Sequence, residues 1–219
     1  MVTLEDVKNN KKVKIYIEKS DKYLESIGYT EHGFRHAKIT AKIAEDVLAR
    51  LKFPSGEVEL AGIAGYLHDI GNLMGRDFHG QGGSLLAANI LEEAGMETEK
   101  IATVLGAIGN HEDEEHIPAN AVSAAVILAD KSDVHKSRVR NPSMIKFDIH
   151  DRVNYAAKKS ILKVDNEKKN ITLELIIDTS ISQVMEYFEI FLTRMNVCRK
   201  AANFLNCSFN LIINNVKLL

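Results

Sequence analysis

Cysteine and long apolar runs are both scarce in this chain of 219 residues. Its two cysteines, Cys198 and Cys207, form no CxxC pair, so neither a disulfide framework nor a cysteine-based zinc site is expected. No apolar run approaches the roughly 18–20 residues that span a bilayer, and the first residues lack the apolar core of a signal peptide. We therefore expect a cytoplasmic protein with reduced thiols and no membrane insertion.

Several motifs of nucleophilic and nucleotide chemistry are also missing. The sequence contains no GxSxG nucleophile motif and no GxxxxGK[ST] phosphate loop. The formal net charge is −2, which argues against general binding to DNA. The charge is uneven, however, because residues 1–130 carry 13 basic against 21 acidic side chains, and residues 131–219 carry 15 against 9. The basic part begins at Lys131, directly after an aspartate that closes an apolar segment.

The first 160 residues predict helices. They are rich in Ala, Leu, Ile, Glu and Lys, and the whole chain has only three prolines. Apolar residues recur at helical spacing, and Gly71 is expected to end the third helix. Thr3 with Asp6 resembles a capping box, and Ser55 and Thr98 are expected N-caps. The expected helices span about residues 3–27, 33–51, 55–67, 83–94, 98–110 and 119–135.

The character of the sequence changes near residue 160. The segments ILKVD and ITLELIID are rich in β-branched residues, and NEKKN between them predicts a hairpin loop. An amphipathic helix is expected over about 182–204, followed by a last strand at FNLII. We therefore predict a mainly α protein, with a helical domain at 1–160 and a small ββαβ extension at 161–219. An exposed edge of the small sheet would allow a homodimer through this extension.

Six side chains in the helical part are of the types that bind metals. Imidazole nitrogens and carboxylate oxygens are donors that Fe, Mn, Co, Ni or Zn accept. Several of them close apolar helical segments such as AGIAGYLHD and AVILAD, where an unpartnered charge would be costly to bury. Helical bundles build metal sites by presenting such side chains from several helices. The six residues are His36, His68, Asp69, His79, His111 and Asp130.

The order of these residues resembles a known family. His36, then the doublet of residues 68 and 69, then Asp130 resemble the H…HD…D signature of the HD superfamily of metal-dependent phosphohydrolases. The segments LHDIG at residues 67–71 and LAD at residues 128–130 also match the family. The resemblance covers about residues 20–160. His79 and His111 at the intervening positions resemble the binuclear branch of that superfamily. The resemblance implies an HD-type helical bundle.

In the binuclear branch the doublet aspartate bridges two divalent transition metals. The implied ligands are, for the first metal, His36, His68, Asp69 and Asp130, and, for the second, Asp69, His79 and His111. His68 and Asp69 are then the catalytic residues. Fe or Mn is expected, and Zn, Ni, Co or Mg are alternatives. Two metals can bind a phosphate and lower the pKa of a bridging water, so that the bridging hydroxide acts as the nucleophile.

The expected activity is hydrolysis of a phosphate ester or anhydride bond, in a nucleotide or similar small metabolite. HD-GYP enzymes, which cleave cyclic dinucleotides, resemble this chain around the metals, but Asn72 stands where they carry a lysine and the GYP motif is missing. Diadenosine tetraphosphate hydrolases resemble it more closely, through His79-Gly80 and the Ala-Asp-Lys of residues 129–131. Two alternatives stay open: a di-iron oxygenase of the same superfamily, and a catalytically idle regulatory module that binds metal or nucleotide.

Other residues near the six have secondary roles in this interpretation. His32 lies one helical turn before His36 and is either a candidate extra ligand or a surface residue. Asp133 follows Asp130 by one turn and could orient a ligand or face solvent. The acidic run at residues 112–115 could bind an extra cation or form a solvated loop. The expected substrate-binding residues, at the start of the basic part, are Lys131, Arg138 and Arg140.

Overall fold

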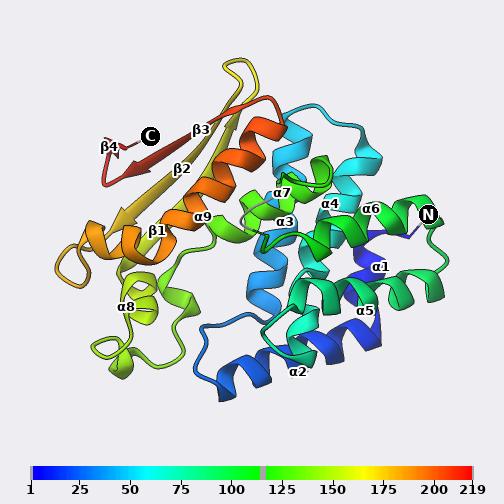
Figure 1. Ribbon diagram of the computed structural model, residues 1–219, viewed down its shortest axis with the longest axis horizontal. Coiled ribbons are helices and arrows are strands. Elements are labelled where there is room, and N and C mark those ends of the chain that lie inside the picture. Colours follow the sequence, from blue (N-terminus) through cyan, green and yellow to red (C-terminus); the bar gives the residue numbers. More distant parts are fainter. Residues whose placement is uncertain (1, 114–116, 219) are drawn as a thin grey trace.

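The computed structural model describes residues 2–113 and 117–218. Its first part is a bundle of α-helices (Figure 1), in chain order α1 (Leu4–Asn9), α2 (Lys11–Ser26), α3 (Phe34–Arg50), α4 (Ser55–Leu67), α5 (His79–Glu93), α6 (Thr98–Gly109) and α7 (Ala121–Ser132). Short 3₁₀ helices, η1 (Ile70–Met74), η2 (Lys136–Arg138) and η3 (Pro142–Met144), follow α4 and α7. The predicted mainly α architecture is confirmed. Among the described residues, no helix is both long and apolar enough to cross a membrane.

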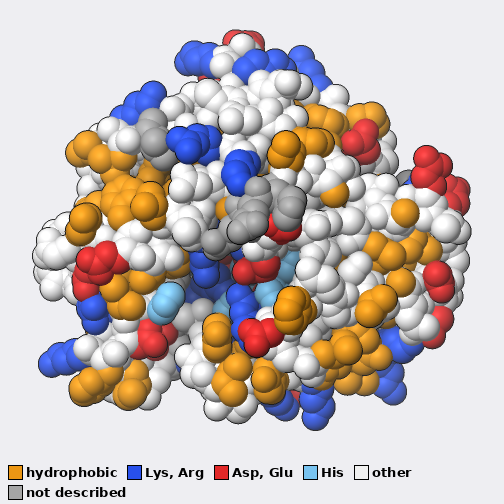
Figure 2. All heavy atoms as spheres, viewed as in Figure 1, with side chains coloured by type: hydrophobic (Ala, Val, Ile, Leu, Met, Phe, Trp, Pro, Cys, Tyr) orange, Lys and Arg blue, Asp and Glu red, His pale blue; other side chains and the backbone are white. Residues whose placement is uncertain are grey.

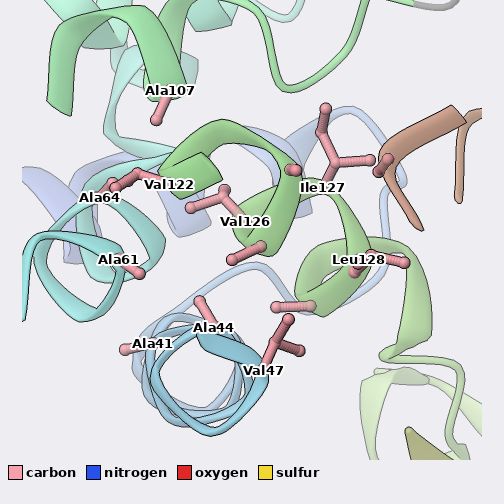
Figure 3. Packing of buried hydrophobic residues seen from close by; sticks show 14 of the residues in the cluster. Ala41, Ala44, Val47, Ala61, Ala64, Ala107, Val122, Val126, Ile127 and Leu128 are labelled. Atoms are coloured by element: carbon pink, nitrogen blue, oxygen red, sulfur yellow. The ribbon is translucent and has the colours of Figure 1, made fainter. Parts of the chain in front are cut away.

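Small side chains let the central helices approach one another closely. Ala41 and Ala44 of α3 face Ala61 and Ala64 of α4, with α7 packed beside both (Figure 3). At Gly65 of α4, a Cβ atom would lie 3.0 Å from the Cα of Ala41, so this crossing has no room for a larger residue. The close packing brings the first turn of α3 next to the last turn of α4, where candidate ligands lie.

The N-terminal segment forms two helices, so the prediction of one helix up to residue 27 was wrong. The capping box of Thr3 and Asp6 is present at the start of α1. The helix breaks at Asn10, whose backbone is extended (ψ 124°). The Asn10 side chain accepts hydrogen bonds from the backbone amides of Lys12 and Val13, and so caps α2. This local alternative to the helical hydrogen bond explains the break.

Two other predicted helices start where the sequence placed them, at residues 55 and 98, but their N-caps lie one residue earlier than expected. Ser55 and Thr98 are the first residues of α4 and α6, and not their caps. The N-cap residues are Pro54 and Glu97, neither of which caps its helix through a side-chain hydrogen bond. The predicted helix at 119–135 is shorter in the structure, because Asn120 caps α7 through the amide of Ser123 and the helix ends at Ser132.

Gly71 does not end a helix, as the sequence had predicted. It lies within η1, after α4 has already ended, and the chain there packs directly against α5. A Cβ atom on Gly71 would lie 1.8 Å from the carbonyl oxygen of His79 and 2.3 Å from the amide nitrogen of Gly83. Helix α5 begins at His79, four residues before the predicted start at Gly83. Because Gly71 has no side chain, η1 can pack closely against the start of α5. This close packing allows Asp69 to lie near His79.

The C-terminal part contains α8 (Ile149–Ala156), β1 (Ala157–Asp165), β2 (Asn170–Ile177), α9 (Val184–Phe204), β3 (Ser208–Ile213) and β4 (Val216–Lys217). Strands β1 and β2 are antiparallel, and β3 is parallel to β2, so a crossover is needed and α9 provides it. The predicted ββαβ order is confirmed, with the short β4 added at the edge of β3. Helix α9 packs on the sheet and on α7. The division into separate domains near residue 160 stays a prediction.

We predict that Gly71→Ala destabilises the protein by about 3 kcal/mol or more, because the new methyl group meets backbone atoms that cannot rotate away. Thermal unfolding should then occur about 6–12 °C lower for a chain of this size. Gly56→Ala is the matched control, since a Cβ atom there has nothing within 4 Å and alanine favours the helix. Equal midpoints for Gly71→Ala and the wild type would contradict this account of the turn.

Candidate metal centre

The six predicted ligand residues meet in the interior of the helical bundle. His36 lies in the first turn of α3, Asp130 in the last turn of α7, and His79 at the first position of α5. His68 and Asp69 follow α4 directly, and His111 follows the end of α6. None of the six residues is more than 9% exposed. Side chains from three helices, and from the segments that directly follow two others, are thus brought to one buried place.

One group of atoms gathers around Oδ2 of Asp69. The Nε2 atom of His36 lies 3.5 Å from this oxygen, and the Nε2 atom of His68 lies 3.3 Å from it. The two Nε2 atoms are 3.1 Å apart. The Oδ1 atom of Asp130 lies 3.2 Å from His36 and 3.7 Å from His68. Two imidazoles and two carboxylates therefore converge on one point.

A second group gathers around the other oxygen of Asp69. Its Oδ1 atom lies 3.4 Å from Nε2 of His79 and 4.0 Å from Nε2 of His111. These two Nε2 atoms are again 3.1 Å apart. Glu112 lies beside this group, with Oε1 3.8 Å from His111. The carboxylate of Asp69 thus lies between the two groups, with one oxygen toward each.

Hydrogen bonds at the far nitrogens fix the imidazole rings. The Nδ1 atoms of His68, His79 and His111 lie 2.8, 2.9 and 2.7 Å from backbone carbonyl oxygens of Gly65, Arg76 and Ile108. Because a carbonyl oxygen only accepts, each Nδ1 carries the hydrogen and donates it. In a neutral ring, Nε2 then carries a lone pair that points into the site.

His36 is oriented by a carboxylate. Its Nδ1 atom lies 2.8 Å from Oδ2 of Asp133. Both oxygens of Asp133 also accept hydrogen bonds of 2.9 Å from the guanidinium of Arg35. The pKa of Asp133 is lowered despite its burial, mainly by the hydrogen bond to His36 and the charge of Arg138, so its carboxylate is ionised. Asp133 therefore orients the His36 ring, whereas its support of a metal ligand stays a prediction.

The charges at the centre favour a cation. Burial opposes charge on Asp69 and Asp130, but His68 beside Asp69 and Lys131 beside Asp130 hold the pKa of these carboxyls well below the usual range. Burial lowers the pKa of His79, and that of His111 to about 3, so these rings are neutral. Burial would also lower the pKa of His68, but the neighbouring carboxylates raise it to about 10. The carboxylates therefore attract positive charge to this point.

The residues present fit a metal-binding role. Oδ2 of Asp69 is buried and has no hydrogen-bond partner among the described residues. Lone pairs on His79 and His111 that face each other at 3.1 Å repel unless a cation balances them. Three sets of side chains place their donor atoms close enough to hold an ion: His36, His68 and Asp130; His68, Asp69 and His111; His79, His111 and Glu112. The acidic run contributes Glu112 here, whereas Glu114 and Glu115 lie outside the described residues.

The predicted substrate-binding residues lie in different surroundings. Lys131 is buried and pairs with Glu112 and with Oδ2 of Asp130 at 2.8 Å. Arg138 is buried and donates to the backbone oxygens of Glu31 and Asp133. Arg140 pairs with Asp21 and donates to the backbone oxygen of Tyr29, on the outside of the loop that precedes α3. Their roles in binding a substrate stay predictions.

His32 lies next to the centre and lines a pocket. Its ring packs edge-on against His36, with ring centroids 5.5 Å apart, and its Nδ1 atom lies 2.6 Å from the backbone oxygen of Thr30. Burial lowers the pKa of His32 well below its ordinary value, so the ring is neutral. His32 belongs to none of the three ligand sets, and its role as an extra ligand stays a prediction.

Sequence reasoning missed Arg76. Its Nη1 atom lies 3.3 Å from Nε2 of His79 and 4.0 Å from Oδ1 of Asp69, and its Nη2 atom lies 3.5 Å from Glu112. The guanidinium also packs over the ring of Tyr29, 5.5 Å from its centroid. The sequence offers one signal, because Arg76 is the single Lys or Arg between Asp69 and His79.

A pocket of about 320 Å³ opens beside the centre. Arg76 and His32, which touch the ligand residues, form part of its wall together with Arg138. Helix α9 contributes Phe191 and Arg194 from the C-terminal part. Figure 2 shows a hollow on this side of the molecule, with histidine and basic side chains at its bottom. Both the helical bundle and the C-terminal part therefore build the wall of the pocket.

Comparison with known proteins agrees with this geometry. The family model described as HD domain matches residues 29–154, which include all six candidate ligands. A protein of Methanocaldococcus jannaschii described as uncharacterized is 32% identical, over 81% of this chain and 77% of that protein. HD domains bind divalent metals, and the histidine and aspartate clusters found here could hold such ions. The chain therefore belongs to the HD-domain family, a superfamily of metal-dependent hydrolases.

Proposed function

We propose that the protein hydrolyses a phosphate ester or anhydride bond in a nucleotide or similar small metabolite, with two divalent metal ions as cofactors. The observation that carries the proposal is the position of Asp69. Each of its carboxylate oxygens faces a separate group of imidazole nitrogens, and a pocket whose wall contains three arginines and two aspartates opens beside the site. This arrangement supports two ions, because the resemblance to the binuclear branch implies one aspartate that serves both metals.

The proposed ligands follow from the two groups. His36, His68 and Asp130 would hold the first ion, His79 and His111 would hold the second, and Asp69 would serve both. Glu112 is a further candidate on the second side. When bound, the metals would lower the pKa of a water molecule and stabilise negative charge on the phosphoryl group. A donor set of imidazoles and carboxylates suits Fe or Mn, and also Zn, Ni or Co; Mg²⁺ prefers oxygen donors.

The chain's own cations would bind the substrate. Arg76 lies between the second group and the pocket, where a planar guanidinium can donate two hydrogen bonds to a phosphate. Arg138 adds a buried positive charge in the same wall. A pocket of about 320 Å³ lies at the lower end of the size range for small-molecule sites. The pocket thus favours a single phosphorylated metabolite over a nucleic-acid strand.

We predict that the purified protein contains close to two transition-metal ions per chain. The double variant His79→Ala with His111→Ala should retain about one, because the ligands around Oδ2 of Asp69 are unchanged. The measurement is metal analysis by mass spectrometry after purification without chelator. His150→Ala is the control, since His150 is exposed and belongs to none of the ligand sets. One ion per chain in both wild type and double variant would contradict a binuclear centre.

We expect phosphatase activity toward p-nitrophenyl phosphate in the presence of Mn²⁺ or Fe²⁺. Asp69→Ala should lower kcat/KM by about 10³-fold or more, because both ions lose a shared ligand. Chelation should abolish the activity, and added metal should restore it. Oxygen uptake measured in parallel distinguishes the alternative oxygenase. Substrate-dependent oxygen consumption without phosphate release would contradict the proposed hydrolase.

Asp133→Asn tests how His36 is positioned. The amide keeps the shape of the side chain but removes the negative charge that faces Nδ1 of His36, so the affinity for Mn²⁺ should fall about 10-fold or more. Titration of the metal-free protein by calorimetry gives the dissociation constants. Asp178→Asn, which removes a carboxylate paired with Lys158 at the surface, should bind Mn²⁺ as the wild type does. Equal affinities in the two variants would show that Asp133 does not support the site.

A further inference from the structure

Helix α9 places one arginine of the C-terminal part in the wall of the pocket. Arg194 and Phe191 lie on this helix, and the guanidinium of Arg194 packs over the ring of Phe191, 4.7 Å from its centroid. The family model ends at residue 154, before this helix begins. The arginine is therefore contributed by a segment outside the matched domain, and it lies on the same pocket as Arg76 and Arg138.

Arg194 differs from other arginines of the chain in its partners. Arg140 pairs with Asp21, and Arg152 pairs with Glu186 at 2.5 Å. Within residues 2–113 and 117–218, no carboxylate lies within 4.0 Å of the Arg194 guanidinium. Its side chain is only partly exposed and is held over an aromatic ring. A guanidinium that is fixed in this way, and lacks an acidic partner, is available to an anionic ligand.

The arginines in the pocket wall differ in how directly they contact the candidate metal centre. Arg76 contacts His79 directly and lies within 4.0 Å of Asp69, so it is close to the proposed metals. In the described part of the chain Arg194 pairs with neither Asp69 nor Asp130, although its charge reaches Lys131, which donates a hydrogen bond to Asp130. Arg138 is buried and lies beside Asp133, and the carboxylate of Asp133 also pairs with Arg35. Asp148 and Asp151 also line the pocket, but neither pairs with Arg194 among the described residues, so one anionic group at the centre leaves the charge of Arg194 without a direct partner.

We infer that Arg194 belongs to a second anion subsite of the pocket, which binds a phosphate of the substrate other than the one held at the metal centre. The inference rests on the proposed function and narrows its substrate class to small metabolites with at least two phosphates. Arg194 is a substrate-binding residue, because it contacts a phosphate away from the reacting bond. The C-terminal part then takes part in substrate selection.

The test measures the binding of two probes to protein loaded with Mn²⁺ and freed of excess metal. Inorganic phosphate has one phosphoryl group, and imidodiphosphate has two joined by a nitrogen that resists hydrolysis. Calorimetry should give tighter binding of imidodiphosphate to the wild type. Arg194→Ala should weaken imidodiphosphate binding about tenfold or more, while phosphate binding changes less than about twofold. The affinity of Arg194→Lys for imidodiphosphate should fall between those of the wild type and Arg194→Ala, because lysine keeps the charge but lacks the planar guanidinium.

Arg199→Ala is the matched control on the same helix, because Arg199 is exposed and lies outside this pocket. It should bind both probes as the wild type does. Three results would overturn the inference: unchanged imidodiphosphate binding in Arg194→Ala, an equal loss for both probes, or no preference for imidodiphosphate in the wild type. Absence of phosphatase activity with a selective loss of imidodiphosphate binding would instead remove the proposed reaction and leave the subsite in place.

Discussion

A carboxylate buried between four imidazoles is the constraint on which the other features of this structure depend. Asp69 is 8% exposed, and an ionised carboxylate at such a place is costly unless opposite charge or hydrogen bonds compensate. The neighbouring imidazoles give partial compensation, yet Oδ2 has no hydrogen-bond partner in the described part of the chain. A bound cation would supply the rest. The close contact of α3 with α4, and of η1 with α5, maintains this geometry.

The ligand set could be predicted from the sequence because its members have unusual surroundings. A His-Asp doublet at the end of AGIAGYLHD, and an aspartate at the end of AVILAD, are ionisable groups next to apolar residues. Helical periodicity likewise predicted most helices, since burial of one face leaves a repeat in the sequence. The change to β-branched residues near residue 160 predicted the sheet in the same way.

The features that were missed depend on local or distant contacts that leave no periodic pattern. Asn10 breaks a helix through its own side chain, and an asparagine at that position has no distinctive sequence context. Gly71 was predicted as a helix stop, whereas its small size matters because α5 crosses there. Arg194 lies 125 residues after Asp69, so only the packing of α9 against α7 reveals that it shares a pocket with Arg76. Such relations require tertiary structure.

The hydrogen bonds that orient the imidazole rings differ in how far apart the two bonded residues lie in the sequence. His68, His79 and His111 each donate to a carbonyl three residues earlier, so a single local turn is enough to orient each ring. His36 instead depends on Asp133, 97 residues away. Closing a long loop has a larger entropic cost than forming a turn. Three rings can therefore be oriented early in folding, whereas the fourth acquires its orientation only when α3 and the end of α7 have come together.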